Sequence, residues 1–318
     1  MNTEEFHTTV AEDENFVSDV KRTLLYYEVF HYPLTPMQLF TFLPSNSLTF
    51  NEFYSKIQKE VFSAEIKEKK GFICIGDESE TEMRLKHEHN AASLLRIAKA
   101  VTHIIKRFPF VRGIFLSGEL SKLVSAKDGD IDFMIVTALN RLWICRTLLI
   151  LFKKIFLLNN KKYFCLNYFV AENNLLLQEH NIYTATEVAH LKPMYNSELF
   201  KEYMRVNNWI QNFFPNFSLA RMNILKTNNR RSTLQKIIET LFPHNFALQL
   251  DRWLMKRTEN IWKSRYPEYD AETRDRIFKC QPDESRTFVR HFEKIFFERY
   301  NAALKKFHIS VPSLPQHS

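Results

Sequence analysis

Glycine is scarce in this sequence, with only five residues among 318, whereas an average protein contains roughly 7%. Glycine is the residue that most readily allows a tight turn or the close approach of a ligand to the backbone. The scarcity therefore predicts a chain rich in helix with few long flexible loops. Three of the five, Gly113, Gly118 and Gly129, fall within seventeen residues, so this segment is the first place to search for a site.

Several patterns that indicate common sites are missing as well. The sequence has no glycine-rich Rossmann or P-loop motif and no G-x-S-x-G elbow, so dinucleotide, P-loop and hydrolase sites have no support. No C-x-x-C pair occurs, which argues against a zinc knuckle or a thioredoxin-like redox site. Three of the cysteines lie in apolar patterns, as buried thiols do in a reducing compartment. The four cysteines are Cys74, Cys145, Cys165 and Cys280.

Long apolar runs are absent too. The most apolar stretch, 142–158, is interrupted by Arg146, Lys153 and Lys154, so it lacks the roughly 18 apolar residues of a membrane span. Residues 1–14 are polar and acidic and do not resemble a signal peptide. We therefore expect a cytoplasmic protein without membrane insertion. Peripheral association through an amphipathic helix over 141–158 stays open.

Charge is the property in excess. The net charge is +8 and the pI is about 9.2. A basic balance favours an anionic partner, such as a nucleotide, a nucleic acid or a lipid surface, although a lysine-rich solvated surface produces the same balance.

Apolar periodicity and proline positions divide the chain, and we expect an α+β fold. The predicted parts are a disordered tail over 1–14, a winged-helix-like module over 15–80, a core with a small mixed β-sheet over 81–180, a helical domain over 181–309 and a loose tail over 310–318.

The first of these modules shows the order three helices and then a hairpin over 66–75, which is the order of a winged helix. Thr35-Pro36 is a typical helix start, because it joins a capping residue to proline at the first turn. Winged helices bind DNA or only mediate packing, and both readings remain open. In the helical half, we expect the core to contain Trp209, Trp253 and Trp262.

The glycine-framed segment, 113–136, is the one that indicates chemistry. It predicts a strand, a Ser-Gly turn, a short helix, a polar turn and a second strand that carries Asp130 and Asp132. Side chains alternate across a strand, so both carboxylates should share one face while Ile131 and Phe133 enter the other. Two close carboxylates repel unless a cation lies between them, and Mg²⁺ commonly binds one or two carboxylates together with substrate phosphates.

Other interpretations of these acids are weaker. Asp128-x-Asp130-x-Asp132 matches the start of an EF-hand loop, but Phe133 and Leu139 occupy the positions that require Gly and Glu. A pair of residues that caps a turn remains an alternative. His87 and His89 lie two apart on a charged helix and face different sides, so we expect a surface pair rather than a zinc site.

Ser117-Gly118-Glu119, followed by Asp130-Ile131-Asp132-Phe133, resembles the signature of the nucleotidyltransferase superfamily related to DNA polymerase beta. That signature is an apolar residue, Gly, then Gly or Ser, about ten residues, and then Asp-apolar-Asp-apolar. The stretches 109–118 and 141–146, together with the winged-helix-like start, look like the stand-alone bacterial nucleotidyltransferase-domain proteins of that superfamily. The motif covers about twenty residues and the core about 105–180.

The resemblance implies transfer of a nucleotidyl group from a nucleoside triphosphate, with ATP as the first choice, to an unidentified acceptor. Asp130 and Asp132 would be the catalytic residues and would hold Mg²⁺ or Mn²⁺. The turn would bind the nucleotide's phosphates through the backbone. The nucleotide-binding residues implied are Ser117, Gly118, Glu119, Ser121 and Lys122.

Two departures from the family pattern stand out. Glu119 replaces the usual Ser or Gly, and its charge would repel a triphosphate unless metal, Lys122 or Lys127 offsets it; alternatively it caps the helix start. The family's third carboxylate lies on a later strand, where this chain has Asn167, with Glu172 just beyond.

These departures leave two alternatives open. The first is a degenerate nucleotidyltransferase fold that binds a nucleotide or a partner without turnover, and the second is a winged-helix nucleic-acid binder.

Overall fold

The computed structural model describes residues 3–45, 48–60, 62, 65–75, 77, 79–158, 162–222, 224, 227, 230–270, 273–274, 277–287 and 292–310. Helices make up 56% of the chain, as the low glycine content predicts, and they surround one six-stranded mixed sheet and a small antiparallel one. The α+β class and the mixed sheet are therefore confirmed. Of the tail predicted over 310–318, residues 311–318 lie outside the described residues.

The N-terminal part has the predicted order of helices and hairpin. Thr35 caps α2 and forms a capping box with Gln38, which stabilises the helix start. The turn between β1 and β2 is the pair Lys70-Gly71, with φ angles of 54° and 80°, as two-residue hairpin turns require. The elements are α1 (Thr3–Glu28), α2 (Pro36–Thr41), α3 (Phe50–Glu60), β1 (Ile66–Lys69) and β2 (Phe72–Ile75).

The first helix corrects one prediction. α1 begins at Thr3, so the disordered tail expected over 1–14 is helical over 3–14. Extending an existing helix costs much less than starting one, because each added residue gains a backbone hydrogen bond. The packed part of α1, which includes the buried Phe16 and Val20, provides that start.

The large sheet has the strand order β6-β3-β4-β5-β8-β7, in which β4 and β5 are parallel and the other neighbours are antiparallel. Three predicted strands are present: β3 (Val111–Ser117), β4 (Asp132–Thr137) and β5 (Cys165–Ala171). The other three are β6 (Lys192–Tyr195), β7 (Phe278–Cys280) and β8 (Glu284–Thr287).

The last three strands correct the prediction of a wholly helical segment over 181–309. Each has only three or four residues, too few to show an alternating pattern. Pro193 lies in β6 at the edge of the sheet. Proline is tolerated on an edge strand because its missing N–H leaves no ladder bond unmade.

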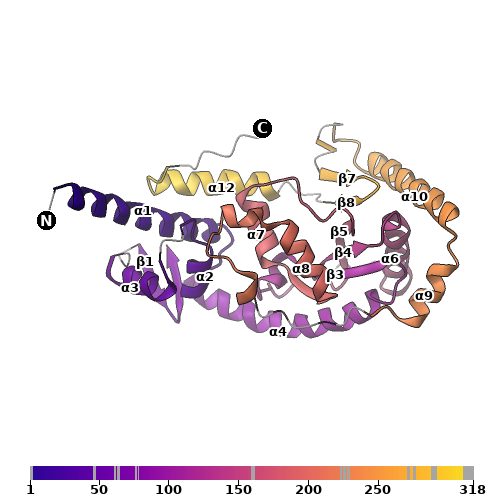
Figure 1. The fold of residues 1–318 in the computed structure, drawn as a ribbon, viewed down its shortest axis with the longest axis horizontal. Coiled ribbons are helices and arrows are strands. Elements are labelled where there is room, and N and C mark those ends of the chain that lie inside the picture. Colours follow the sequence, from indigo (N-terminus) through magenta and orange to yellow (C-terminus); the bar gives the residue numbers. More distant parts are fainter. Residues whose placement is uncertain are drawn as a thin grey trace.

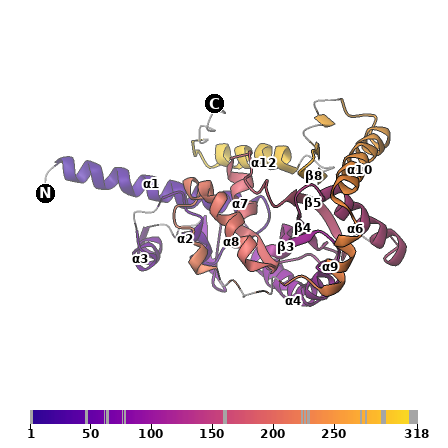
Figure 2. The same cartoon turned by 45° about the vertical axis from the view of Figure 1, so that its right-hand side comes forward.

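The helices cover both faces of this sheet (Figure 1; Figure 2). One apolar cluster joins Phe133 and Ile135 to α4, α6 and α10. The other joins Met134 and Val136 to the N-terminal helices and to α7, α8 and α12. The helices that follow the hairpin are α4 (Ser79–Ile105), α5 (Gly118–Ser121), α6 (Leu142–Phe156), α7 (Ile182–His190), α8 (Ser197–Val206), α9 (Thr233–Thr240), α10 (His244–Arg265) and α12 (Phe292–Lys306).

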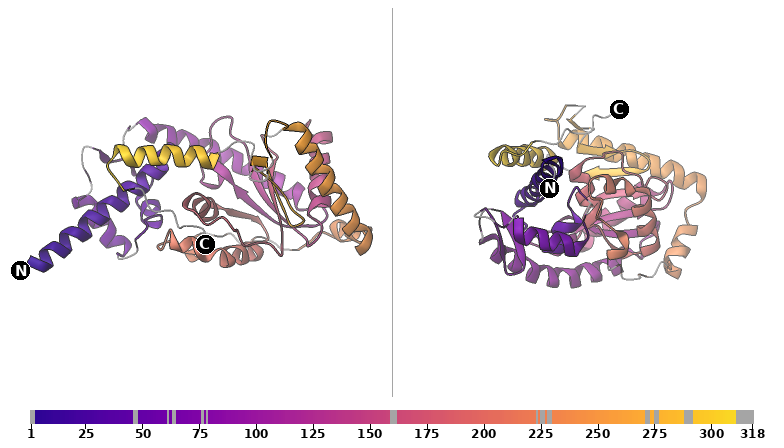
Figure 3. Two further views of the ribbon diagram at one scale, coloured as in Figure 1. Left: turned by 90° about the horizontal axis from the view of Figure 1, so that it is seen from above. Right: turned by 60° about the vertical axis from the view of Figure 1, so that its left-hand side comes forward.

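The last helix of the described chain lies against the first one. α12 runs beside α1 (Figure 3), and Phe296 packs against Tyr26 and Phe30 with ring centroids 4.7 and 5.3 Å apart. The apolar cluster that contains Met134 and Val136 therefore connects the N-terminal module, one face of the sheet and the last helix.

One tryptophan contradicts the predicted core. Trp209 and Trp262 are buried, as expected, but Trp253 is 55% exposed. α10 is long enough to have two complete sides, and Trp262 and Ala247 lie on the side that packs against α6. Trp253 lies on the outer side of α10. The prediction was wrong because apolar spacing alone does not show which side of a helix packs against the rest of the protein.

Candidate functional site

The Ser-Gly turn after β3 lies directly against Asp132. Ser117 and Asp132 are partners in the β3–β4 ladder, and the Ser117 hydroxyl donates to the Asp132 carbonyl oxygen at 3.3 Å. Gly118 has a φ of +67°, and a Cβ atom there would lie 2.5 Å from Asp132 Oδ2. Only glycine allows this left-handed turn and this close approach together, so the carboxylate and the turn form one unit.

A β-bulge places Asn167 beside the same carboxylate. Asp132 pairs with Cys165 and Met134 with Tyr168, so one residue of β4 faces two residues of β5. Bulges re-aim a side chain locally. Asn167 Nδ2 thus lies 3.4 Å from Asp132 Oδ1 and 3.0 Å from Cys165 Sγ. Phe169 nevertheless stays in the cluster on the opposite face of the sheet.

The surroundings of Asp132 disfavour the charged form of its carboxyl group. Burial raises its pKa, and the charges of Asp130, Glu187 and Glu119 raise it further, while a hydrogen bond with Cys165 acts in the opposite direction. Removal from water and nearby like charges both disfavour a carboxylate. A divalent cation at this position would favour the charged carboxylate.

Asp130 precedes β4 and is exposed. The predicted alternation holds for its neighbours, since Ile131 and Phe133 are both buried in the apolar cluster beneath the sheet. The two predicted acids therefore lie on the side away from that cluster, close enough for the charge of Asp130 to act on Asp132.

Glu119 and Ser121 both stabilise the loop that follows the turn. Glu119 is exposed and its carboxylate accepts from the Ala126 N–H at 3.4 Å. The buried Ser121 hydroxyl donates to the Gly118 carbonyl oxygen at 2.7 Å. The hydroxyl that we assigned to a nucleotide therefore closes the turn itself in this structure.

Lys122 forms an ion pair that the sequence did not predict. Its ammonium group lies 2.7 Å from Glu187 of α7, and its side chain is only 12% exposed. The Tyr32 hydroxyl also donates to the Lys122 carbonyl oxygen at 2.9 Å. No local pattern marks Glu187, because it lies 65 residues away from Lys122 in the chain.

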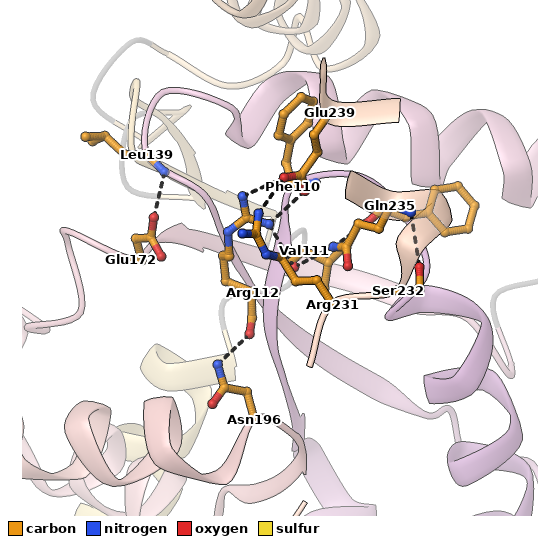
Figure 4. Close-up of polar contacts among 11 residues, drawn as sticks. Phe110, Val111, Arg112, Leu139, Glu172, Asn196, Arg231, Ser232, Gln235 and Glu239 are labelled. Carbon is orange, nitrogen blue, oxygen red and sulfur yellow. Dashed lines mark hydrogen bonds and ion pairs between the residues drawn. The ribbon is translucent and has the colours of Figure 1, made fainter. Parts of the chain in front are cut away.

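Glu172 does not belong to the site. β4 and β5 are parallel, with Asp132 at the first end of the pair and Ala171 at the last. Glu172 follows the last end, where its carboxylate accepts from the Leu139 N–H at 3.4 Å (Figure 4). Glu172 is five residue steps beyond Asn167 along an extended chain, about 16 Å, so its prediction as a possible third position is wrong.

Thr287 of β8 also reaches this edge of the sheet, and its hydroxyl donates to the Asn167 carbonyl oxygen at 3.3 Å. Sequence reasoning missed Cys165, Glu187 and Thr287. Cys165 alone carried a signal, as a cysteine in a predicted strand two residues before Asn167. Burial raises the pKa of its thiol, and the charge of Asp132 adds to the effect.

Within the described ranges, no group of three or more His, Cys, Asp or Glu side chains is arranged to hold a metal. Two hollows among the described residues also lie elsewhere, one along α10 and one lined by Leu219, Met222 and Ile224 among others. A metal at this edge of the sheet would therefore rest on Asp130 and Asp132, with its other ligands from water or substrate.

Comparisons with known proteins add nothing to this geometry: no family model matches the chain, and neither the curated proteins nor the solved structures contain a match. In the part of the chain that the structure describes, no helix is long and apolar enough to cross a membrane.

Proposed function

We propose that this chain is a Mg²⁺-dependent nucleotidyltransferase, which moves a nucleotidyl group from a nucleoside triphosphate to an acceptor and releases pyrophosphate. The observation that carries the proposal is the left-handed turn at Gly118, which lies against the Asp132 carboxylate. A turn without a side chain lets a phosphate approach the backbone, and the adjacent carboxylate provides the place for its counter-ion.

The donor set fits a magnesium ion. Asp132 is a carboxylate whose burial and acidic neighbours disfavour its charge, and Asp130 is exposed beside it. Both supply the hard oxygen ligands that Mg²⁺ prefers, and substrate phosphates commonly complete its coordination. The ion would supply charge neutralisation and polarisation of the phosphate that is transferred.

The surrounding residues would hold the carboxylates in position. Asn167 and Cys165 both contact Asp132, and the Ser117 hydroxyl holds the start of β4. The mixed sheet and the N-terminal order of helices and hairpin agree with the nucleotidyltransferase and winged-helix resemblance. They support it at the level of architecture only.

Binding of a non-hydrolysable ATP analogue with and without Mg²⁺, measured by calorimetry, tests the proposal. Asp130→Asn and Asp132→Asn each keep the shape of the side chain and remove the charge. We expect each substitution to weaken Mg²⁺-dependent binding by at least about tenfold. Asp132→Asn should not destabilise the fold, because the charge that it removes is already disfavoured there.

Asp128→Asn is the matched control, because this side chain is 93% exposed and pairs with the Lys162 ammonium group at 3.4 Å. Its substitution should leave binding unchanged. Wild-type protein that binds no nucleotide in the presence of Mg²⁺, or an Asp132→Asn variant that binds as well as wild type, would contradict the proposal.

A second candidate is a nucleotidyltransferase-like fold that binds a nucleotide or a partner without turnover. The ion pair between Lys122 and Glu187 favours it, because this pair engages the ammonium group that the resemblance assigns to the nucleotide. Asn167 in place of an acid favours it too, since an amide cannot accept a proton as a base.

Label transfer separates the two candidates. Incubation with α-³²P-labelled nucleoside triphosphates and a cell extract as the acceptor pool should yield a labelled product with wild type and none with Asp132→Asn. A labelled product excludes the non-catalytic candidate, whereas tight nucleotide binding without transfer favours it.

A further inference from the structure

α9 is turned with its polar side toward the protein. Gln235 is fully buried, and its amide donates to the carbonyl oxygens of Phe108 and Val111, both at 2.9 Å. Glu239 accepts from the Arg112 guanidinium at 2.8 Å and from the Phe110 N–H at 2.7 Å. Figure 4 shows both side chains directed at the start of β3.

The opposite side of α9 is apolar and faces solvent. Leu234, Ile237 and Leu241 are 57, 57 and 69% exposed, and their spacing of three and four residues places them on one face. A surface helix normally has the reverse orientation, with its apolar side toward the core. An outward apolar face of this kind marks an interaction surface.

α10 also has apolar residues on its exposed side. Phe246, Trp253 and Ile261 are 56, 55 and 46% exposed. The Arg257 guanidinium lies 5.4 Å from the Trp253 ring centroid. A shallow hollow runs along this outer side of the helix, lined among others by Trp253, Lys256, Arg257 and Ile261.

The end of α6 adjoins α9 through a row of rings. Phe156 packs on Phe152 and Phe152 on Phe108, with centroids 5.0 and 5.3 Å apart, and the Phe108 carbonyl oxygen accepts from Gln235. Ile155 and Phe156 are 65 and 68% exposed. Together α6, α9 and α10 form the end of the molecule farthest from α1 (Figure 1; Figure 2).

This end is strongly basic. Residues 230–265 include eight Lys or Arg and three Asp or Glu, which gives +5 of the chain's net charge of +8. Each of the three acids has a partner: Glu239 binds Arg112 and Arg231, Asp251 accepts from the Ile144 N–H and Glu259 pairs with Lys263. Two of the eight cations are engaged in these pairs, and the other six exceed the acids. The charge presented outward is therefore positive.

We propose that the outer sides of α9 and α10, called here the α9–α10 face, dock onto an anionic lipid surface. Helices that combine outward Leu, Ile, Phe and Trp with Lys and Arg lie in the interface between lipid head groups and acyl chains. The basic residues are attracted to anionic head groups, and the apolar ones leave water.

Charge and side-chain type favour a lipid surface over a nucleic acid or a second copy of this chain as the partner of the α9–α10 face. The phosphates and base edges of a nucleic acid are polar, so they offer no apolar surface against which to bury Leu234, Ile237 and Leu241. A second copy that met this face symmetrically would place positive charge against positive charge. The inference does not depend on the proposed nucleotidyl transfer.

Co-sedimentation of the full chain with lipid vesicles tests it. We expect binding to phosphatidylcholine vesicles that contain phosphatidylglycerol, weak binding to phosphatidylcholine alone, and loss at high salt. The variant Leu234→Ser/Ile237→Ser/Leu241→Ser should lower the partition coefficient by at least about tenfold. Lys256→Gln/Arg257→Gln should lower it by about 25-fold, because each charge near an anionic membrane contributes about fivefold.

A matched control replaces three exposed apolar residues at other places on the surface. Met37, Phe292 and Ile295 are 45, 55 and 43% exposed, and their substitution by Ser should leave vesicle binding unchanged. Thermal unfolding of all variants shows whether the fold persists, which is expected because every changed side chain is exposed.

Four results would overturn the inference. They are absence of vesicle binding, equal binding to neutral and anionic vesicles, a concentration-dependent dimer that the α9 triple variant dissociates, and binding of duplex or single-stranded nucleic acid in place of vesicles by wild type. The first two exclude an anionic lipid partner, and the last two identify a second copy or a nucleic acid as the occupant.

Discussion

Gly118 combines two requirements at one residue. Its φ of +67° lies in the left-handed region, and its missing Cβ leaves room for the Asp132 carboxylate. A left-handed conformation costs a non-glycine residue about 1–2 kcal/mol. The space for the Asp132 carboxylate belongs to the candidate site, whereas the left-handed conformation concerns the fold. A substitution of Gly118 should therefore affect both stability and ligand binding.

We predict that Gly118→Ala lowers the free energy of unfolding by about 1–2 kcal/mol and also weakens Mg²⁺-dependent nucleotide binding, because the new methyl group displaces the Asp132 carboxylate. Gly71→Ala is a close control: Gly71 has a φ of +80°, and a methyl group there would have no other atom within 4 Å. Urea denaturation should show a similar loss for both, whereas calorimetry should show weaker binding for Gly118→Ala alone. Equal nucleotide binding by the two variants would show that Gly118 is not part of the nucleotide site.

At the scale of elements, α9 is attached to β3 mainly by polar contacts. Burial acts to raise the pKa of Glu239, but the hydrogen bonds from Arg112 and the Phe110 N–H and the charges of Arg112 and Arg231 outweigh it, so the pKa is lowered. A lowered pKa in the folded state means that the contact stabilises the protein above the pKa of the unfolded state and is lost as the pH falls through the folded-state pKa.

We therefore predict that Glu239→Gln lowers the free energy of unfolding by about 1–3 kcal/mol at pH 7. The difference from wild type should shrink as the pH falls below about 4.5, the usual range of a glutamate, because wild-type Glu239 then takes up a proton. Urea denaturation at neutral and acid pH measures both effects.

Glu202→Gln is the comparison for that experiment. Glu202 forms an ion pair with Arg205 on the exposed side of α8, and exposed pairs add little to stability. A Glu239→Gln effect that stays constant with pH would show that the contact does not depend on the charge of Glu239.

At the scale of the whole molecule, Phe296 connects distant parts of the chain. It is 2% exposed and packs against Tyr26, Tyr183 and Tyr300. These contacts join α12 to α1 and to α7, which covers one face of the sheet. Because one apolar cluster spans all of them, we expect the N-terminal module and the sheet to unfold together.

Phe296→Ala should lower the free energy of unfolding by about 3–5 kcal/mol. All four tryptophans lie at position 143 or later, so fluorescence reports the sheet region while far-ultraviolet circular dichroism reports all helices. Both signals should shift together in urea. Phe292→Ala, in the same helix but 55% exposed, should change neither. A shift of the dichroism signal alone would mean that the module unfolds separately.

The sequence by itself determined what depends on short-range order. The Ser-Gly turn at Gly118, the strand that carries Asp132 and the shared face of Ile131 and Phe133 all follow from patterns within about twenty residues. The same is true of the α2 start at Thr35 and of the hairpin turn at Gly71. In each case the backbone preference of one residue, or the alternation of a strand, is sufficient.

Only the tertiary structure decided what depends on pairing across the chain. The bulge that brings Asn167 to Asp132 depends on the register of β4 with β5, and the Lys122–Glu187 pair on where α7 lies. Glu172 was misplaced because sequence distance does not show which end of a parallel pair a residue reaches. The outward apolar side of α9 has the same origin: periodicity shows that a helix has two sides, but Arg112 and the carbonyl groups around it decided which side faces the protein.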